Sequence, residues 1–406
     1  MSAHGHEAKQ LTAAQVTFSE DHLVRKLPVI GAIVGVLGIG GAAALGLGED
    51  GSFYHSYLVA FMYFLSIALG GMFFVLIQFV TRAGWSVVIR RVAENIMASL
   101  PGCALLFLPL LFGLHDLYHW THADAVASDP LLQWKEPFLN ESAFHFRAVF
   151  YFAVWAGLSW YFYKRSTSQD ATGDHGITAS LQRLAAPAII FYGLSQTFAS
   201  FDWMMSLEPH WYSTMWGVYY FAGSFVAILA VLSLLSIRFS TEGQPLHGIV
   251  TVEHRHDLGK LLWGFMVFWT YIAFSQYFLI WYANIPEETL FFAHRSEGTW
   301  DAVSVFLAVG HFGIPFLCFM SRHVKRSVMG LTFFATWMLF MHYVDLYWIV
   351  MPLLHHHGIH FGIVDILAFI GVGGVFVGTV AWLMPRTPLV PVRDPRLPES
   401  LAFENF

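Results

Sequence analysis

The sequence predicts an all-α integral membrane protein with about ten transmembrane helices. Of its 406 residues, 56% are hydrophobic and 12% are charged, about half the charged share of soluble domains, and the mean hydropathy is +0.57. A helix that crosses the bilayer core needs roughly 20 apolar residues. Stretches of that kind lie at about 27–47, 53–80, 86–113, 144–163, 182–202, 211–237, 260–283, 300–320, 328–350 and 361–384.

The distribution of positive charge predicts the orientation of the chain. An even number of spans leaves both termini on one side of the membrane. All but three of the 21 lysines and arginines fall on that side, and the exceptions are Lys135, Arg147 and Arg295. Because cationic loops resist translocation, we expect both termini in the cytoplasm.

Composition also excludes several classes of protein. The net charge of −6 is spread along the chain without a basic block, so nucleic acid is not an expected partner. Cys103 and Cys318 are the two cysteines, and they cannot form an iron–sulfur cluster or a haem attachment motif. We therefore expect no metal or haem bound by this chain. Residues 1–26 are polar without an apolar core, so no cleavable signal peptide is expected.

A short link between the fifth and sixth apolar stretches carries ionisable groups among tryptophans. Asp202, Glu208 and His210 stand beside Trp203 and Trp211. Indole rings gather at the level of the lipid headgroups, where the apolar ring and the polar N–H each meet a suitable environment. The link is therefore expected at the outer membrane surface, either as an entrance for protons or as a contact with another subunit.

Two segments carry a resemblance to a known family: FDWMMSLEPHW at 201–211 and LIWYANIPEE at 279–288. Both resemble the ActF-type membrane subunit of bacterial alternative complex III, a quinol-oxidising respiratory complex, which is related to the NrfD-like (polysulfide reductase) membrane subunits. The similarity extends from about the first apolar helix to the last. It implies a location in the bacterial inner membrane. The implied partners are membrane lipids, a sister NrfD-like subunit that binds quinol, and haem c and iron–sulfur subunits that carry the electrons.

The resemblance also implies the arrangement of the helices. Two four-helix bundles would be flanked by two peripheral helices. The expected divisions are a cytoplasmic segment at 1–26, a first helix at 27–52, bundles at 53–202 and 203–350, a last helix at 351–384 and a cytoplasmic tail at 385–406. The first and last helices carry small residues at G-x-x-x-G spacing, Gly31 with Gly35 and Gly374 with Gly378, which allows close helix approach. These glycines serve either packing within the chain or a subunit interface.

Ionisable side chains at membrane depth are the candidate functional residues. Each costs about 2.5–3.5 kcal/mol on insertion scales, so each needs a partner, a water-lined cavity or a function. His342 and Asp345 share a helical face, and an imidazole beside a carboxylate can relay protons; a structural hydrogen bond between helices is the alternative. His311 is either a further relay group or a satisfied core histidine. The candidate proton path comprises Asp345, His342, His311, Asp202, Glu208, Asp365, Asp301, His145 and Arg147.

A second polar group is expected on the inner side of the membrane. It comprises Arg90, Arg91, Glu94 and Lys260. Arg90 and Glu94 have the i, i+4 spacing of an intrahelical ion pair. We expect these residues to have a structural role, with the cations extending toward the headgroups.

These expectations favour a subunit that contributes scaffold and a proton-conducting path to quinol oxidation, with quinone binding left open. Two other classes fit the same composition: a proton-coupled secondary transporter, and a purely structural membrane scaffold.

Overall fold

The computed structural model describes residues 11–48 and 51–405, and this part of the chain is helical without strands. Nine helices in it are long and apolar enough to cross a membrane. They are α1 (Leu27–Gly46), α2 (Ser52–Val80), α3 with α4 (Val87–Met97, Leu100–Phe112), α9 (His175–Trp203), α10 (Trp216–Phe239), α11 (Val252–Ala283), α13 with α14 (Trp300–Leu307, Ile314–Phe319), α16 (Val328–Val350) and α17 (Ile363–Leu383).

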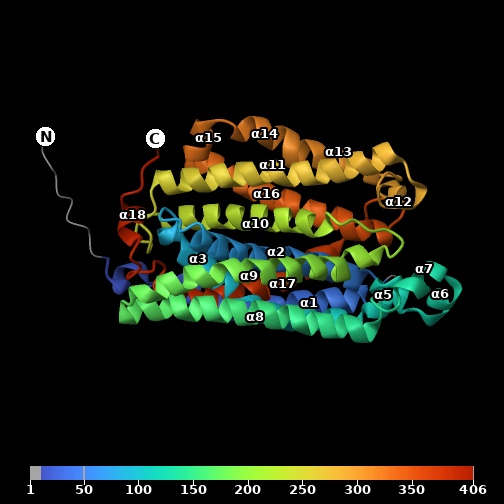
Figure 1. Ribbon diagram of the computed structural model, residues 1–406, viewed down its shortest axis with the longest axis horizontal. Helices are drawn as coiled ribbons and strands as arrows, with labels where there is room; N and C mark the ends of the chain where they lie inside the picture. Colours follow the sequence, from blue (N-terminus) through green and yellow to red (C-terminus); the bar gives the residue numbers. More distant parts are fainter. Residues whose placement is uncertain (1–10, 49–50, 406) are drawn as a thin grey trace, which may run out of the picture.

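A further long helix, α8 (Glu141–Thr172), lies along α9 over its length (Figure 1). It is less apolar than the others because tryptophan and tyrosine rings and Arg147 replace aliphatic side chains. The predicted set of about ten helices is therefore confirmed. The predicted stretch at 144–163 is shorter than the helix, which continues to Thr172 and turns at Gly173, where φ is +68°.

Short helices connect the long ones. The connections hold α5 (Leu114–Leu117), α6 (Ala123–Ser128), α7 (Pro130–Lys135), α12 (Pro286–His294) and α15 (Arg322–Arg326), and α18 (Leu397–Leu401) lies in the C-terminal segment after α17. Single turns of 3-10 helix are η1 (Ala13–Val16), η2 (Leu23–Arg25), η3 (His119–Thr121), η4 (Met205–Leu207), η6 (Met351–Leu353) and η7 (Met384–Arg386).

The long helices form two groups of four. In the first, α2, α3 with α4, α8 and α9 pack around one another; in the second, α10, α11, α13 with α14 and α16 do so. Helices α2 and α10 also pack against each other and join the two bundles. Because α2 is surrounded by α3, α9, α10, α16 and α17, 89% of its most apolar window is buried. It is the central helix of the protein.

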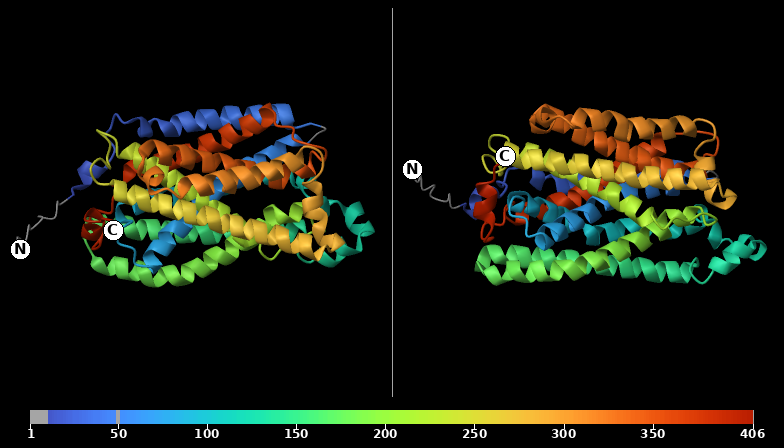
Figure 2. Two further views of the ribbon diagram at one scale, coloured as in Figure 1. Left: turned by 90° about the horizontal axis from the view of Figure 1, so that it is seen from above. Right: turned by 45° about the horizontal axis from the view of Figure 1, so that its top comes forward.

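Helices α1 and α17 lie at the edge of the bundles and pack closely on one another (Figure 2). The glycines of both helices form this contact. A Cβ on Gly31 would lie 2.3 Å from the Gly374 carbonyl oxygen, and one on Gly38 would lie 2.5 Å from the Gly371 Cα. The sequence left two roles open for these glycines, packing within the chain or a subunit interface. In the structure they pack α1 against α17 within the chain.

Both ends of the described chain lie at one end of the bundles, which we call the terminal end (Figure 1). The opposite end, which we call the loop end, holds α5, α6, α7 and α12. Lys135 and Arg295 belong to the loop end, and the Arg147 side chain reaches toward it from α8. The predicted charge asymmetry therefore follows the two ends of the fold; Lys9, one of the residues counted, lies outside the described residues.

Candidate functional site

A cluster of polar side chains lies inside the second bundle. Asp345 on α16 is buried, and the hydroxyl of Tyr219 on α10 donates a hydrogen bond to its Oδ1. The Tyr219 ring lies 5.6 Å from the ring of Trp269 on α11. Trp269 in turn stacks on His311, with 3.7 Å between centroids and 18° between the planes. Three helices and the interrupted helix α13–α14 therefore meet at one polar centre.

His342, one turn before Asp345 on α16, faces a different neighbour. Its Nε2 lies 2.8 Å from the Oγ of Ser66 on α2, and its ring lies 5.4 Å from that of Tyr63. Close passage of α10 makes room for the imidazole, because a Cβ on Gly223 would lie 3.0 Å from the His342 Cε1. The predicted pairing of His342 with Asp345 is not a direct hydrogen bond. They share a helical face but contact α2 and α10 respectively.

Several buried nitrogens in this cluster have no hydrogen-bond partner. They are both ring nitrogens of His311, Nδ1 of His342 and Nε1 of Trp269. An unpaired buried polar group costs about 1–3 kcal/mol, and such groups are usually paired with ordered water. His311 lies in a π-helical turn, η5 (Ala308–Gly313), a local insertion that frequently marks functional sites. Among the described residues, His311 is therefore not a core histidine whose ring nitrogens are paired with neighbouring side chains.

A buried arginine connects this centre to the loop end. Arg295 lies close enough to Tyr219 for electrostatic interaction. Its guanidinium donates to the Glu208 Oε2 at 2.9 Å and to the carbonyl oxygens of Phe291, Trp348 and Ile349. The other Glu208 oxygen lies 2.5 Å from the His294 Nδ1. Glu208 thus joins the interior to the half-exposed His294.

These charges shift the pKa values of the loop-end groups. Burial raises the pKa of Glu208, but the Arg295 charge and the hydrogen bond to His294 outweigh this effect, so its pKa lies below the usual 4.5. The hydrogen bond to Glu208 raises the pKa of His294 above the usual 6.5. Both residues line a cavity of about 540 Å³ at the loop end. Its further ionisable lining consists of His55, His115, Asp116, His119, His122, His210 and His356.

Asp202 and Arg147 form a separate site in the first bundle. The Arg147 guanidinium donates two hydrogen bonds of 2.8 Å to the two Asp202 oxygens, and the Tyr151 hydroxyl donates a third at 2.7 Å. A carboxylate held by a bidentate arginine is stabilised in its charged form. Asp202 is therefore suited to fixing α8 against α9, whereas Asp345 has no cation within ion-pairing distance among the described residues.

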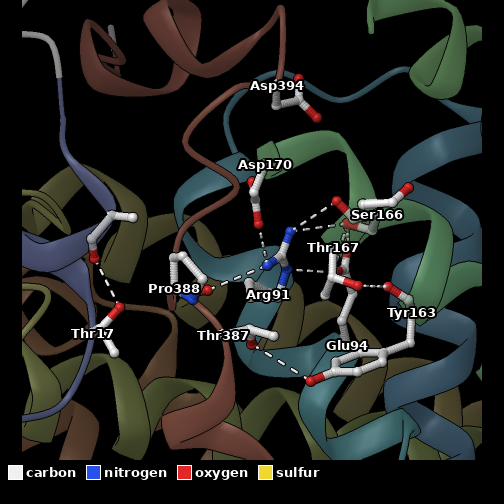
Figure 3. Close-up of polar contacts among 12 residues, drawn as sticks. Thr17, Arg91, Glu94, Tyr163, Ser166, Thr167, Asp170, Thr387, Pro388 and Asp394 are labelled. Carbon is white, nitrogen blue, oxygen red and sulfur yellow. Dashed lines mark hydrogen bonds and ion pairs between the residues drawn. The ribbon is translucent and has the colours of Figure 1, made fainter. Parts of the chain in front are cut away.

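The group predicted on the inner side is more extensive than expected. Glu94 pairs with Arg90 at 3.1 Å and with Arg91 at 2.7 Å, Arg91 also pairs with Asp170 at 2.7 Å, and Arg90 with Asp394 at 2.6 Å. Figure 3 shows Arg91 between α8 and the C-terminal segment, where it also donates to the Ser166 and Pro388 carbonyl oxygens. Both arginines are buried, with 3% and 0% exposure, so the prediction that they extend toward the headgroups was wrong.

Lys260 does not belong to that group. It pairs with Asp257 at 2.5 Å and donates to the Asn405 side chain, and its own side chain is 46% exposed. The sequence placed Lys260 at the correct end of the protein. It did not predict that Lys260 lies apart from Arg90, Arg91 and Glu94, because α11 and α3 belong to different bundles.

Three residues of the predicted path lie away from the polar centre. Asp301 is exposed in the first turn of α13, and His145 is half-exposed on α8 with its ring against Phe144. Asp365 is buried but caps the start of α17, where it accepts hydrogen bonds from the Gly362 N–H and the Ser56 hydroxyl. Asp301 and His145 are therefore surface residues and Asp365 is a helix cap, and none of the three lies at the polar centre.

Sequence reasoning missed the residues that link the predicted ones. Tyr219, Trp269 and Ser66 are uncharged, so the search for ionisable groups passed over them. The signal for Arg295 was present, because it is one of the three basic residues that the charge distribution sets apart from the other eighteen. Its burial against Glu208 depends on the turn after α12, which the sequence did not predict.

The fold and the polar centre define the class of this protein: an all-α, multi-pass membrane protein with a buried, partly unpaired histidine–carboxylate centre. No protein-family model matches the sequence, and a search of curated proteins finds no match.

Proposed function

We propose that this chain is an ActF-type membrane subunit of a bacterial quinol-oxidising respiratory complex, and that it provides scaffold and a proton path. The path would run from the loop-end cavity through His294, Glu208 and Arg295 to Tyr219 and Asp345. His342 and His311 would lie at its inner end. The proposal rests on the resemblance of the two sequence segments and on the polar centre in the second bundle.

The observation that carries the proton path is the environment of Asp345. A buried carboxylate without a cation takes up a proton more readily than a carboxylate held by a bidentate arginine, which stays ionised. Tyr219 can donate to the ionised form, and the unpaired imidazole nitrogens can accept or release the proton. These groups give a proton a site at membrane depth.

The charge distribution supports an orientation with the terminal end in the cytoplasm and the loop end outside. Redox centres would belong to partner subunits: haem c and iron–sulfur proteins and a sister NrfD-like subunit that binds quinol. Whether quinone also binds this chain is left open by the proposal.

The experiment that tests the proposal measures quinol:acceptor turnover and proton release in the intact complex. The variant carries Asp345→Asn and His342→Ala together, and Asp301→Asn serves as an exposed control on a helix of the same bundle. We expect lost turnover and proton release with assembly and haem content unchanged in the double variant only. Unchanged turnover would mean that Asp345 and His342 serve helix packing only, and it would favour the alternative of a purely structural scaffold subunit.

A secondary transporter is separated from this proposal by purification. Its substrate site is usually formed by interrupted helices at corresponding places in two repeats. Here the interruptions follow α3, in the second helix of one bundle, and α13, in the third helix of the other. A transporter would also purify alone, whereas the proposed subunit would purify with haem proteins.

A further inference from the structure

A cavity of about 460 Å³ lies between α2, α10, α16 and α17, in the half of the protein toward the terminal end. Its walls are almost entirely apolar. Ile67, Leu235, Leu339 and Ala381 are typical lining residues from the four helices. Ligand pockets commonly have volumes of about 300–1,000 Å³, so the cavity is large enough for part of a small molecule.

The cavity has a side that faces the membrane. Helices α16 and α17 both pack on α2, but α16 packs further on α10 and α17 on α1. Ring contacts between them, such as Tyr343 with Phe369 at 4.9 Å, lie toward the loop end. Toward the terminal end, Val377 lines the cavity and is 48% exposed. An apolar chain in the adjacent leaflet therefore has lateral access to the cavity.

The arginine and the histidine of the lining lie at the end of the cavity at the protein surface. Arg238 ends α10 and is exposed; its guanidinium donates to the Thr241 hydroxyl at 3.4 Å and forms no ion pair with a described carboxylate. His22, also part of the lining, is held by Gln244, whose Oε1 lies 3.0 Å from the His22 Nε2. The site thus combines an apolar interior with an unpaired cation at its mouth.

We propose that this cavity binds one acyl chain of an anionic phospholipid from the leaflet at the terminal end, with the lipid phosphate on Arg238. Basic residues between transmembrane helices attract anionic headgroups, and an apolar cavity without polar partners does not retain water. An isoprenoid quinone fits the mouth less well, because its neutral headgroup does not use the Arg238 charge. The Tyr63 hydroxyl, the polar group deepest in the cavity, already donates to the Leu339 carbonyl oxygen.

The test measures lipids that remain bound to the full-length protein after purification in detergent. Membranes containing both anionic and zwitterionic phospholipids supply the protein, and mass spectrometry quantifies the retained lipid and quinone per chain. Val377→Trp fills the membrane side of the cavity, and Val36→Trp places the same ring on the exposed face of α1 as its control. Arg238→Gln removes the cation, and Arg183→Gln removes an exposed arginine on α9 as its control.

We expect wild-type protein and both controls to retain an anionic phospholipid that Val377→Trp loses. Arg238→Gln should lower the ratio of anionic to zwitterionic retained lipid about fivefold, as expected for one headgroup charge. Because Arg238 is exposed, this variant tests the site without disturbing the packing that Val377→Trp alters. Equal retention in Val377→Trp and Val36→Trp, an unchanged lipid ratio in Arg238→Gln, or retained quinone in place of phospholipid would each overturn the proposal.

Discussion

Two buried aspartates show how neighbours decide what a residue type can do. Asp202 and Asp345 each accept a hydrogen bond from a tyrosine, but Asp202 also has Arg147. The arginine fixes the charge of Asp202. Among the described residues, Asp345 has no arginine partner; Tyr219 donates its hydrogen bond beside the Trp269 indole, so this hydrogen bond is the more consequential of the two.

This difference predicts unequal effects of removing the two hydroxyls. Tyr219→Phe leaves a buried carboxylate without its donor, and we expect a loss of about 1–3 kcal/mol in the free energy of unfolding. Tyr151→Phe, the matched control, leaves Asp202 with both arginine hydrogen bonds, so the loss should be smaller. Thermal unfolding of the purified full-length variants measures both. A larger loss in Tyr151→Phe would contradict the assignment.

The buried ion pairs of α3 predict a large stability effect. Arg91→Gln leaves the buried Glu94 and the partly buried Asp170 with fewer cations, and breaking a buried pair from one side costs about 3–5 kcal/mol. Lys260→Gln breaks a partly exposed pair with Asp257, for which we expect less than about 1 kcal/mol. Chemical unfolding in detergent compares the two variants. Similar small losses in both would mean that water reaches the Arg91 site.

The Glu208–His294 pair predicts a pH dependence of stability. The raised pKa of His294 means that its contribution is complete below 6.5 and is lost as pH rises through the folded-state pKa. The lowered pKa of Glu208 means that its contribution is present above 4.5 and is lost as pH falls. The pair should therefore stabilise the fold most between pH 4.5 and 6.5.

Thermal unfolding of wild-type protein and His294→Gln across this range measures the effect. The difference between them should be greatest in the window and fade above the raised pKa of His294. Glu208→Gln in both backgrounds should remove the pH dependence of the difference. A difference that grows with increasing pH would show that His294 contributes in its neutral form.

At the scale of helices, most of the architecture could be predicted from the sequence. Stretches of about 20 apolar residues are enforced by the bilayer, so their positions follow from composition alone. The ends of the helices were predicted less accurately from the sequence. Polar residues 164–172 continue α8 as a helix, and Ser166 and Asp170 in this part hold it against Arg91 of α3. The π-helical turn around His311 directly precedes the helix turn that holds Pro315, and it packs against α11 and α16.

The contacts between side chains of different helices were the least predictable part. His342 and Asp345 were correctly placed on one face, since helical spacing fixes that relation. Their partners Ser66 and Tyr219 come from α2 and α10, and the sequence carries no signal for which helices become neighbours. Arg90 and Arg91 show the same limit, because their partners Asp394 and Pro388 come from the far end of the chain.

The contact of α1 with α17 predicts opposite effects for two glycines. A Cβ on Gly38 would meet the Gly371 backbone at 2.5 Å, whereas one on Gly40 would meet no atom within 4 Å. We expect Gly38→Ala to lose about 1–3 kcal/mol through overpacking, and Gly40→Ala to gain about 0.5–1 kcal/mol from its higher helix propensity. Thermal unfolding of the two variants decides this. Stabilisation by both would mean that α1 and α17 separate easily.

On the scale of the whole molecule, the C-terminal segment after α17 joins parts that are distant in sequence. Asp394 pairs with Arg90 of the first bundle, and the Leu389 N–H donates to the Val16 carbonyl oxygen. The Ser400 carbonyl oxygen lies 3.0 Å from the His254 Nε2 of the second bundle. The segment therefore links both bundles and the N-terminal region at the terminal end.

Removing residues 387–406 should loosen both bundles at this end together. Arg90 would lose one of its two carboxylates and His254 its carbonyl partner, so amide hydrogen exchange should rise in α3 and in the first turns of α11. Helices at the loop end should keep their protection. Removing residues 404–406 is the control, because it retains Asp394, Ser400 and Phe403 and breaks the contacts of Asn405 with Lys260 and Glu253. Faster exchange in α3 but not in α11 would mean that the segment stabilises the first bundle alone and that the packing of α2 on α10 is sufficient to hold the two bundles together.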